Sequence, residues 1–206
     1  MTFTLPKIYP ITDTRISGLS HLEQVRRLIL GGATLIQLRD KYAPVGEFYR
    51  SAVEAVGYAH QRDVKIIIND RTDIVLAADA DGVHLGQDDL SPRHARDLLG
   101  PTAIIGFSTH SIEQARDALA MPIDYLAIGP IFATSTKDDA DPVVGPGGLR
   151  SVRELDRNFP IVAIGGISRD NSASVLSSGA DCVAMISDLI SDPSTIADRM
   201  RELRNL

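Results

Sequence analysis

The chain has 206 residues, 44% of them hydrophobic and 23% charged, with a formal net charge of −6 at pH 7. These values fit one globular domain spanning residues 1–206, and they argue against a broad nucleic-acid footprint. One cysteine excludes an intramolecular disulfide, no apolar run reaches membrane-spanning length, and the N-terminus lacks signal-peptide features, so we expect a cytoplasmic enzyme.

Short apolar runs alternate with amphipathic stretches along the whole chain. Eight of these runs are predicted as strands, over residues 8–12, 34–38, 64–68, 82–85, 103–106, 125–128, 161–164 and 182–186. Most of them are continuously apolar rather than alternating, which is typical of strands covered on both faces in a parallel sheet. Cys182 lies in the last run and is interpreted as a small buried apolar residue.

The stretches between these runs carry helix signals. Residues 21–30 repeat apolar side chains on one face, and Gly31 is expected to take the left-handed conformation that ends this helix. Ser91 and Pro92 form a cap and a first helical position, and Ser111 with Gln114 resembles a capping box. Further helices are predicted over residues 46–61, 170–178 and 193–203.

This order of elements amounts to eight strand-then-helix units of about 26 residues each, near the lower size limit of a (β/α)8 barrel. The predicted fold is therefore a single α/β domain, a parallel eight-stranded TIM barrel. An open doubly wound sheet is the alternative, but no Gly-x-Gly-x-x-Gly follows the first strand. The longest connection covers residues 129–148, and long connections at strand ends are usually functional.

Charged residues follow the second predicted strand. Alternation along a strand places Gln37, Arg39 and Lys41 on one side, where guanidinium and ammonium groups suit phosphate oxygens. A solvated charged turn explains the same residues equally well. In a barrel, however, the residues after each strand line the catalytic face.

Carboxylates follow the third and fourth strands. Asp70 comes after Asn69, and Asp88 and Asp89 come after Gly86. Carboxylates from adjacent strand ends can share Mg²⁺, together with water and phosphate oxygens. Asp70 is equally plausible as a helix cap, and the residues alone do not separate Asp88 from Asp89.

The remaining strand ends carry hydroxyls and glycines. Ser108 is a candidate phosphate donor, whereas His110 and His84 are interpreted as structural histidines. Thr134, Ser135, Thr136 and Lys137 suit an anion clamp, and the glycines further along the same loop are compatible with a closing lid. The glycine pair 165–166 and the segment 186–187 occupy the position of the phosphate site common in such barrels.

Taken in order, these residues resemble the thiamine phosphate synthases over nearly the whole chain, from Tyr9-Pro10-Ile11-Thr12-Asp13 to Met185-Ile186-Ser187. Residues 37–41 match the family's Gln-x-Arg-x-Lys element, 68–71 and 80–89 match its metal-site region, and 129–137 match its mobile loop. Each element is weak alone, and their order makes the match specific. Ala133 stands where the family often has proline.

The resemblance implies a Mg²⁺-dependent transfer that joins 4-amino-2-methyl-5-hydroxymethylpyrimidine diphosphate to a thiazole phosphate, carboxylated or not, giving thiamine phosphate and pyrophosphate. It implies Mg²⁺ ligation by Asp70 and Asp89. It implies pyrimidine diphosphate binding by Gln37, Leu38, Arg39, Asp40, Lys41, Asn69, Ser108 and Lys137, with Arg39, Lys41, Ser108 and Lys137 acting in catalysis. It implies thiazole phosphate binding by Thr134, Ser135, Thr136, Gly166, Ile186 and Ser187.

Three other functions compete with this one. A thiazole tautomerase of the same superfamily would share the barrel but lack the full diphosphate and metal set, which is present here. A non-catalytic barrel that senses thiamine phosphates has no appended module to support it. A phosphosugar isomerase would rest on fold analogy alone. We expect small-molecule partners, no nucleic acid and no membrane, and apolar helix faces are compatible with a homodimer.

Overall fold

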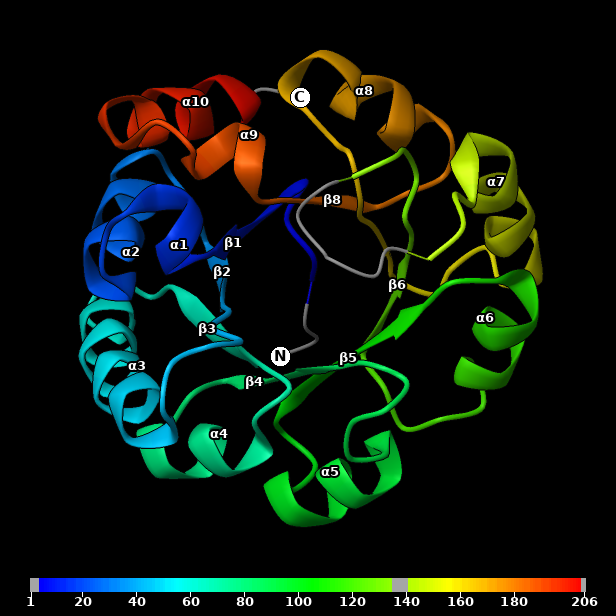
Figure 1. Ribbon diagram of the computed structural model, residues 1–206. Helices are drawn as coiled ribbons and strands as arrows, with labels where there is room; N and C mark the ends of the chain where they lie inside the picture. Colours follow the sequence, from blue (N-terminus) through cyan, green and yellow to red (C-terminus); the bar gives the residue numbers. More distant parts are fainter. Residues whose placement is uncertain (1–3, 135–140, 205–206) are drawn as a thin grey trace.

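The computed structural model describes residues 4–134 and 141–204 and shows a closed parallel barrel surrounded by helices (Figure 1). The strands pair in chain order, and β8 closes the ring by pairing with β1. Their bounds are β1 Ile8–Thr12, β2 Leu35–Leu38, β3 Lys65–Asn69, β4 Gly82–Leu85, β5 Ile104–Thr109, β6 Tyr125–Ile128, β7 Ile161–Ala163 and β8 Cys182–Met185. The predicted (β/α)8 barrel is confirmed, and the open sheet is excluded.

Ten α-helices lie in the described part of the chain, and most of them form a ring around the barrel. None of them is long and apolar enough to span a bilayer. Their bounds are α1 Thr14–Ser17, α2 His21–Leu30, α3 Val45–His60, α4 Thr72–Ala78, α5 Pro92–Leu99, α6 Ile112–Ala118, α7 Gly145–Leu155, α8 Arg169–Ser177, α9 Ser187–Ile190 and α10 Ile196–Leu203, the last preceded by a 3₁₀ turn over Pro193–Thr195.

The core has two layers because successive strand side chains point to opposite faces. Outward-facing side chains such as Ile36, Leu38 and Val83 pack under the helices. Inward-facing side chains fill the barrel and form a separate cluster that includes Tyr9, Tyr125 and Cys182. Both strand faces are therefore covered, which explains the continuous apolar runs in the sequence.

Helix caps follow the sequence signals with one correction. Ser91 and Ser111 accept hydrogen bonds from the backbone of His94 and Gln114. After α2, however, Gly31 has a right-handed φ of −79°, and Gly32 takes the left-handed conformation with φ +97°. The Gly31 position serves a close contact instead, since an added Cβ would lie 2.6 Å from the Ala197 carbonyl oxygen of α10.

Strand β5 extends three residues beyond its predicted end at residue 106. Ser108 and Thr109 are thus part of the strand, and Ser108 lies in register with Ala127 of β6. On the neighbouring strands, Asn69 of β3 lies in register with His84 of β4, and β4 pairs with β5. The strand pairing therefore fixes the backbone positions of several polar residues at the carboxyl end of the barrel.

Candidate active site

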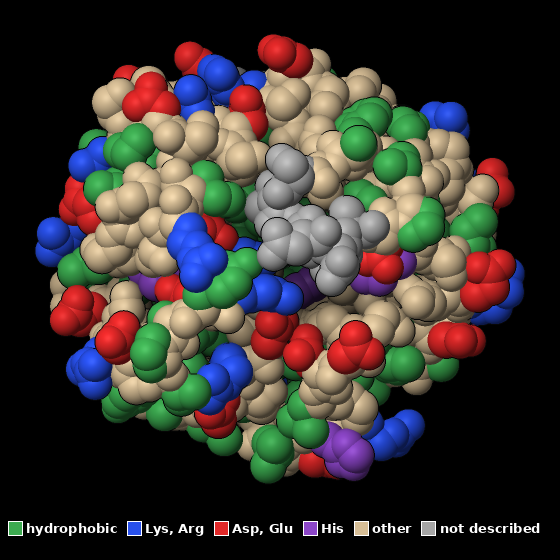
Figure 2. All heavy atoms as spheres, viewed as in Figure 1, with side chains coloured by type: hydrophobic (Ala, Val, Ile, Leu, Met, Phe, Trp, Pro, Cys, Tyr) green, Lys and Arg blue, Asp and Glu red, His purple; other side chains and the backbone are tan. Residues whose placement is uncertain are grey.

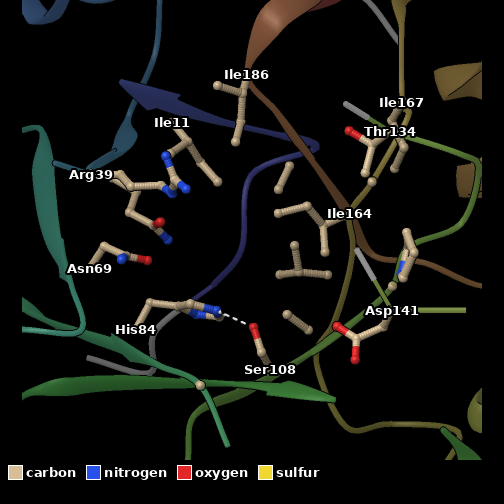
Figure 3. A pocket seen from close by; sticks show the side chains of 18 of the residues that line it. Ile11, Arg39, Asn69, His84, Ser108, Thr134, Asp141, Ile164, Ile167 and Ile186 are labelled. Carbon is tan, nitrogen blue, oxygen red and sulfur yellow. Dashed lines mark hydrogen bonds between the residues drawn. The ribbon is translucent and has the colours of Figure 1, made fainter. Parts of the chain in front are cut away.

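A cavity of about 600 Å³ opens at the carboxyl ends of the strands. Figure 2 shows basic, acidic and histidine side chains close together at the centre of this face. Figure 3 shows Arg39, Asn69 and His84 on one side of the cavity, with Thr134 and Asp141 across from them. The lining includes most of the residues predicted from the sequence, namely Gln37, Arg39, Lys41, Asn69, Asp70, Ser108, Thr134, Gly166, Ile186 and Ser187. Ser135, Thr136 and Lys137 lie outside the described residues.

Two predicted ligand-binding residues have side chains elsewhere. Leu38 is fully buried and packs in the outer layer of the core, because the alternation of β2 turns it away from Gln37 and Arg39. Asp40 faces a second, shallower cavity beside α1 and α3. Neither side chain is placed to bind a ligand in the main cavity.

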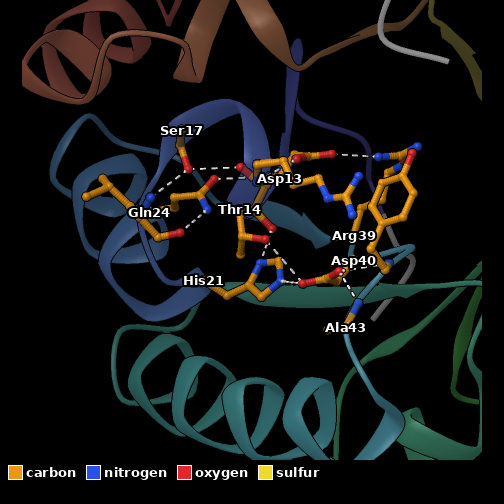
Figure 4. A network of polar contacts seen from close by, with 12 residues as sticks. Asp13, Thr14, Ser17, His21, Gln24, Arg39, Asp40 and Ala43 are labelled. Carbon is orange, nitrogen blue, oxygen red and sulfur yellow. Dashed lines mark hydrogen bonds and ion pairs between the residues drawn. The ribbon is translucent and has the colours of Figure 1, made fainter. Parts of the chain in front are cut away.

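Asp40 stabilises the turn after β2 (Figure 4). Its Oδ1 accepts from the backbone amides of Tyr42 and Ala43 at 3.1 and 2.9 Å. Its Oδ2 accepts from the Thr14 hydroxyl and lies 3.5 Å from His21 Nε2. The neighbouring His21 imidazole holds the pKa of the Asp40 carboxyl well below its usual range. The aspartate therefore holds the loop that presents Lys41.

Arg39 is held by an acidic residue that the sequence interpretation missed. Its NH1 atom lies 2.7 Å from Asp13 Oδ2, and both side chains are largely buried. The other oxygen of Asp13 accepts from the amides of Arg15 and Ile16 and caps α1. This capping pattern is a local signal that could have identified Asp13, but its pairing with Arg39 depends on strand register.

Asp70 and Asp89 form a close carboxylate pair. Burial, and next the Asp89 charge, raise the pKa of Asp70 to about 6. Lys41 Nζ lies 3.8 Å from Asp70 Oδ2, and Asp89 Oδ2 accepts from the Gly86 amide at 2.7 Å. Asp70 does not cap α4, whose cap residue is Arg71. The structure also separates the two aspartates. Asp89 contacts Asp70 but is not among the residues that line the cavity, whereas the exposed Asp88 lines it.

This pair fits a hard divalent cation. Asp70 is partly buried and its ionisation is disfavoured by burial and by the Asp89 charge, and a cation shared by the two carboxylates would relieve this. Within residues 4–134 and 141–204, no group of three His, Cys, Asp or Glu side chains could hold a metal ion. Any cation here would therefore need water and ligand oxygens to complete its coordination.

His84 and His110 both belong to the cavity wall, although the sequence favoured purely structural roles. His84 is 8% exposed, and burial lowers its pKa to about 4, so the ring is neutral near pH 7. Its Nε2 lies 2.8 Å from the Ser108 hydroxyl (Figure 3). His110 Nδ1 lies 2.7 Å from the Gly129 carbonyl oxygen and 3.4 Å from Asp141 Oδ2. Their structural contacts are present, and both rings also border the ligand space.

The opposite wall is formed by the ends of β6, β7 and β8. Gly166 has φ +63°, and a Cβ there would lie 2.6 Å from the Ala133 carbonyl oxygen. Only glycine fits this close approach without strain. Thr134, Ile186 and Ser187 line the same side of the cavity. Apart from Asp141 and Asp188, this wall carries hydroxyl and apolar side chains and glycine backbone, whereas the β2–β5 wall carries both basic and acidic groups.

A closed (β/α)8 barrel with basic groups, paired carboxylates and hydroxyls at its carboxyl end defines a class of enzymes that act on phosphorylated ligands. Comparison with known proteins gives the family. The family model described as thiamine monophosphate synthase matches residues 8–189, and this chain belongs to that family.

Individual relatives agree over almost the full length. The thiamine-phosphate synthase of Koribacter versatilis is 45% identical, with 97% of this chain and 96% of the relative covered. That of Methanospirillum hungatei is 47% identical, with 92% of each covered. The solved structure of thiamine phosphate pyrophosphorylase from Pyrococcus furiosus superimposes with a TM-score of 0.86 at 38% identity, covering 97% of this chain and 94% of the other.

Proposed function

We propose that this protein is a thiamine phosphate synthase, a transferase that joins a pyrimidine diphosphate to a thiazole phosphate and releases pyrophosphate. The supporting observation is that one cavity, in a chain of this family, gathers the basic, amide and hydroxyl groups that such a diphosphate requires. These groups are Gln37, Arg39, Lys41, Asn69 and Ser108. We further propose that the chain acts as one domain.

The β2–β5 wall is assigned to the pyrimidine diphosphate. Arg39 presents a planar fork of donors and Lys41 a mobile positive charge, and both suit the oxygens of a leaving diphosphate. Asn69 and Ser108 add neutral hydrogen-bonding groups on the adjoining strands. Gln37, which is buried at the carboxyl end of the barrel, is assigned to the pyrimidine ring. Lys137 is predicted to join this set and lies outside the described residues.

Asp70 and Asp89 are assigned to Mg²⁺. Bound there, the ion would neutralise charge that develops on the departing diphosphate. The protein's own part is to hold the two carboxylates together, through the Gly86 amide on Asp89 and the backbone bond from the Asp70 amide to the His84 carbonyl. Lys41 balances part of their charge when the diphosphate is absent.

The β6–β8 wall is assigned to the thiazole phosphate. Gly166 allows the backbone to approach a phosphate closely, and Thr134 and Ser187 provide hydroxyls. Ile186 gives an apolar surface for the ring. Ser135 and Thr136 are predicted to complete this wall, outside the described residues. The carboxylated and decarboxylated forms of the thiazole are both compatible with this assignment.

The reaction is a substitution at the methylene carbon of the pyrimidine. The carbon–oxygen bond breaks and its electron pair leaves with pyrophosphate, and the electron-rich aminopyrimidine stabilises the methylene cation. The lone pair of the thiazole nitrogen then forms the carbon–nitrogen bond and gives a thiazolium. No proton is lost from the nitrogen, so no protein base is needed. Arg39 and Lys41 stabilise the leaving charge, and the barrel mouth positions both reactants and excludes water.

The competing functions lack support from the cavity. A tautomerase needs an acid–base group and has no use for the basic β2 wall or the carboxylate pair. A sensor of thiamine phosphates would not need that pair either. We propose a cytoplasmic location, because substrates with this much charge are retained within the cell. A homodimer stays a prediction, and Leu76 on α4 and Leu98 on α5 are exposed apolar side chains.

The test is one assay of purified protein with both substrates, with and without Mg²⁺. We expect thiamine phosphate and equimolar pyrophosphate only when the ion is present. A folded protein that forms neither product would overturn the proposal, and full turnover in excess chelator would remove the metal from it. Isomerisation of the thiazole phosphate in the absence of the pyrimidine substrate would favour the tautomerase.

A further inference from the structure

A continuous chain of side-chain hydrogen bonds crosses the barrel interior between two residues assigned to the pyrimidine diphosphate. It begins at Gln37, whose Nε2 donates to the Tyr9 hydroxyl at 3.1 Å. The Tyr9 hydroxyl lies 3.1 Å from that of Tyr125, which lies 3.0 Å from His84 Nδ1. His84 Nε2 completes the chain, 2.8 Å from Ser108 Oγ (Figure 3). The proposed mechanism gives no role to the three middle residues.

Burial and ring packing fix these middle residues. Tyr9 and Tyr125 are 1% and 0% exposed, so their hydroxyls must be satisfied by protein neighbours rather than by bulk water. The two tyrosine rings meet edge to face with centroids 6.0 Å apart, and His84 stacks on Tyr125 at 5.6 Å. Whether each of these groups donates or accepts therefore depends on its neighbours in the hydrogen-bond chain.

The hydrogen-bond chain from Gln37 to Ser108 has two self-consistent orders of donors and acceptors. Each hydroxyl carries one proton, and a neutral imidazole carries one N–H. When Gln37 donates to Tyr9, the order continues from Tyr9 to Tyr125 and from Tyr125 to His84 Nδ1. His84 Nε2–H then donates to Ser108, whose own proton remains available to a ligand. In the reverse order Ser108 donates to His84 and offers the cavity only lone pairs.

The diphosphate distinguishes the two orders. Phosphate oxygens only accept hydrogen bonds, so a Ser108 hydroxyl that binds them must keep its proton for the ligand. The order that leaves this proton available has the Gln37 amide nitrogen turned to Tyr9, as the structure places it. The Gln37 carbonyl oxygen is then the group left to accept from a ligand, and the amino group of an aminopyrimidine is a matching donor.

We propose that Tyr9, Tyr125 and His84 are positioning residues that give the two ends of the pyrimidine diphosphate site opposite polarity, an acceptor at Gln37 and a donor at Ser108. The hydrogen-bond chain thereby selects a ligand with an amino group at one end and anionic oxygens at the other. It disfavours a 4-oxo pyrimidine, whose oxygen would face the Gln37 carbonyl. The ligand is taken from the proposed function, whereas the hydrogen-bond order is a property of the protein alone.

Nitrogen-15 NMR of histidine-labelled, ligand-free protein tests the order directly, because protonated and unprotonated ring nitrogens differ in chemical shift. The protein has five histidines. The His84 signals are assigned by their loss in His84→Gln and by their shift in Tyr125→Phe. We expect the proton on Nε2 at pH 7. A proton on Nδ1 overturns the proposal. This result does not depend on turnover, so it is separate from any failure of the proposed function.

Ligand selection gives the second test. Tyr9→Phe keeps the ring but releases the Gln37 amide to rotate. We measure binding of two unreactive pyrimidine diphosphates with a methylene in place of the bridging oxygen, one 4-amino and one 4-oxo. We expect the preference for the 4-amino form to fall about tenfold, with the KM for thiazole phosphate unchanged. Tyr49→Phe, on the exposed face of α3, is the matched control.

An unchanged preference in Tyr9→Phe would overturn the selection role of the chain. If Tyr9→Phe fails to fold, Tyr125→Phe takes its place, since it breaks the same chain one residue further along. A general loss of stability would weaken the binding of both analogues equally. Only a change in their ratio reports the polarity of the site.

Discussion

Asp13 Oδ2 lies 2.7 Å from Arg39 NH1, and this ion pair joins the loop after β1 to the end of β2. The same aspartate caps α1 through its other oxygen. One carboxylate therefore fixes a helix start and aims a guanidinium into the cavity. Because the pair is largely buried, we expect it to control the orientation of Arg39 more than its charge.

Asp13→Asn tests that expectation. Asparagine also caps helices, so α1 is kept, but the ion pair is lost. Removing a negative charge makes the cavity more attractive to a diphosphate, whereas a misaimed guanidinium stabilises the leaving charge less well. We expect kcat to fall about tenfold without a rise in the KM for the pyrimidine diphosphate. Steady-state kinetics check this, and Asp198→Asn on the exposed face of α10 is the control.

An unchanged kcat in Asp13→Asn would reduce Asp13 to a helix cap. A raised KM with unchanged kcat would instead mean that Arg39 serves ground-state binding.

The carboxylate pair predicts a pH dependence of stability in the absence of metal. The folded pKa of Asp70, about 6, is above its ordinary value of 3.8, so the folded state favours the protonated form. The contribution of Asp70 to the free energy of unfolding is therefore fully present below about pH 4, and it is lost as the pH rises through about 6. Asp70→Asn should raise the stability of the metal-free protein at pH 7 by up to about 3 kcal/mol.

Thermal unfolding in chelator from pH 4.5 to 7.5 checks this prediction. We expect the Asp70→Asn advantage to grow with pH and to come with loss of Mg²⁺-dependent activity. The backbone there has φ +62°, a conformation that asparagine also tolerates. Asp117→Asn on the exposed surface of α6 is the control. An advantage that is the same at every pH would contradict the assigned cause.

Gly166→Ala is expected to damage the thiazole side of the site. The left-handed backbone and the 2.6 Å approach to the Ala133 carbonyl oxygen leave no room for a methyl group. We expect a loss of about 1–2 kcal/mol in stability and a rise in KM for thiazole phosphate alone. Gly57→Ala is the matched control, because a Cβ in that position of α3 meets nothing within 4 Å. Equal rises in both KM values would contradict the assignment of the two walls.

Gly31→Ala separates stability from function. Its Cβ would press on Ala197 and Met200 of α10, far from the cavity lining. We expect overpacking to cost about 1–3 kcal/mol of unfolding free energy, with kcat/KM unchanged in the folded enzyme. Chemical denaturation and the assay with both substrates measure the two quantities. A drop in kcat/KM would mean that the α2–α10 contact reaches the site.

Much of the fold follows from the sequence because its signals are local. The apolar runs located all eight strands, and serine caps located helix starts such as α5 and α6. The end of β5 could not be located in this way, because Ser108 and Thr109 are polar and join the strand through pairing with β6. Gly31 was expected to take the left-handed conformation, but Gly32 takes it, because Gly31 packs closely against α10.

The site was predictable where strand ends and alternation sufficed, as for Gln37 and Arg39. It was not predictable where a side chain's direction depends on distant neighbours. Asp40 turns to His21, and Asp13 turns to Arg39. His84 was interpreted as a core histidine, and its burial bears this out, but its place beside Ser108 depends on the pairing of β4 with β5.

Closure of the barrel has a consequence for aggregation. Because β8 pairs with β1, each strand has a partner on both sides, and the sheet has no free edge that could recruit a strand from another chain. Such an edge would form if any two neighbouring strands separated, and the β8–β1 pair is the one that joins the two ends of the chain. Resistance to intermolecular strand pairing therefore depends in part on a contact between strands that lie far apart in the sequence, and changes that weaken the β8–β1 pair would favour aggregation.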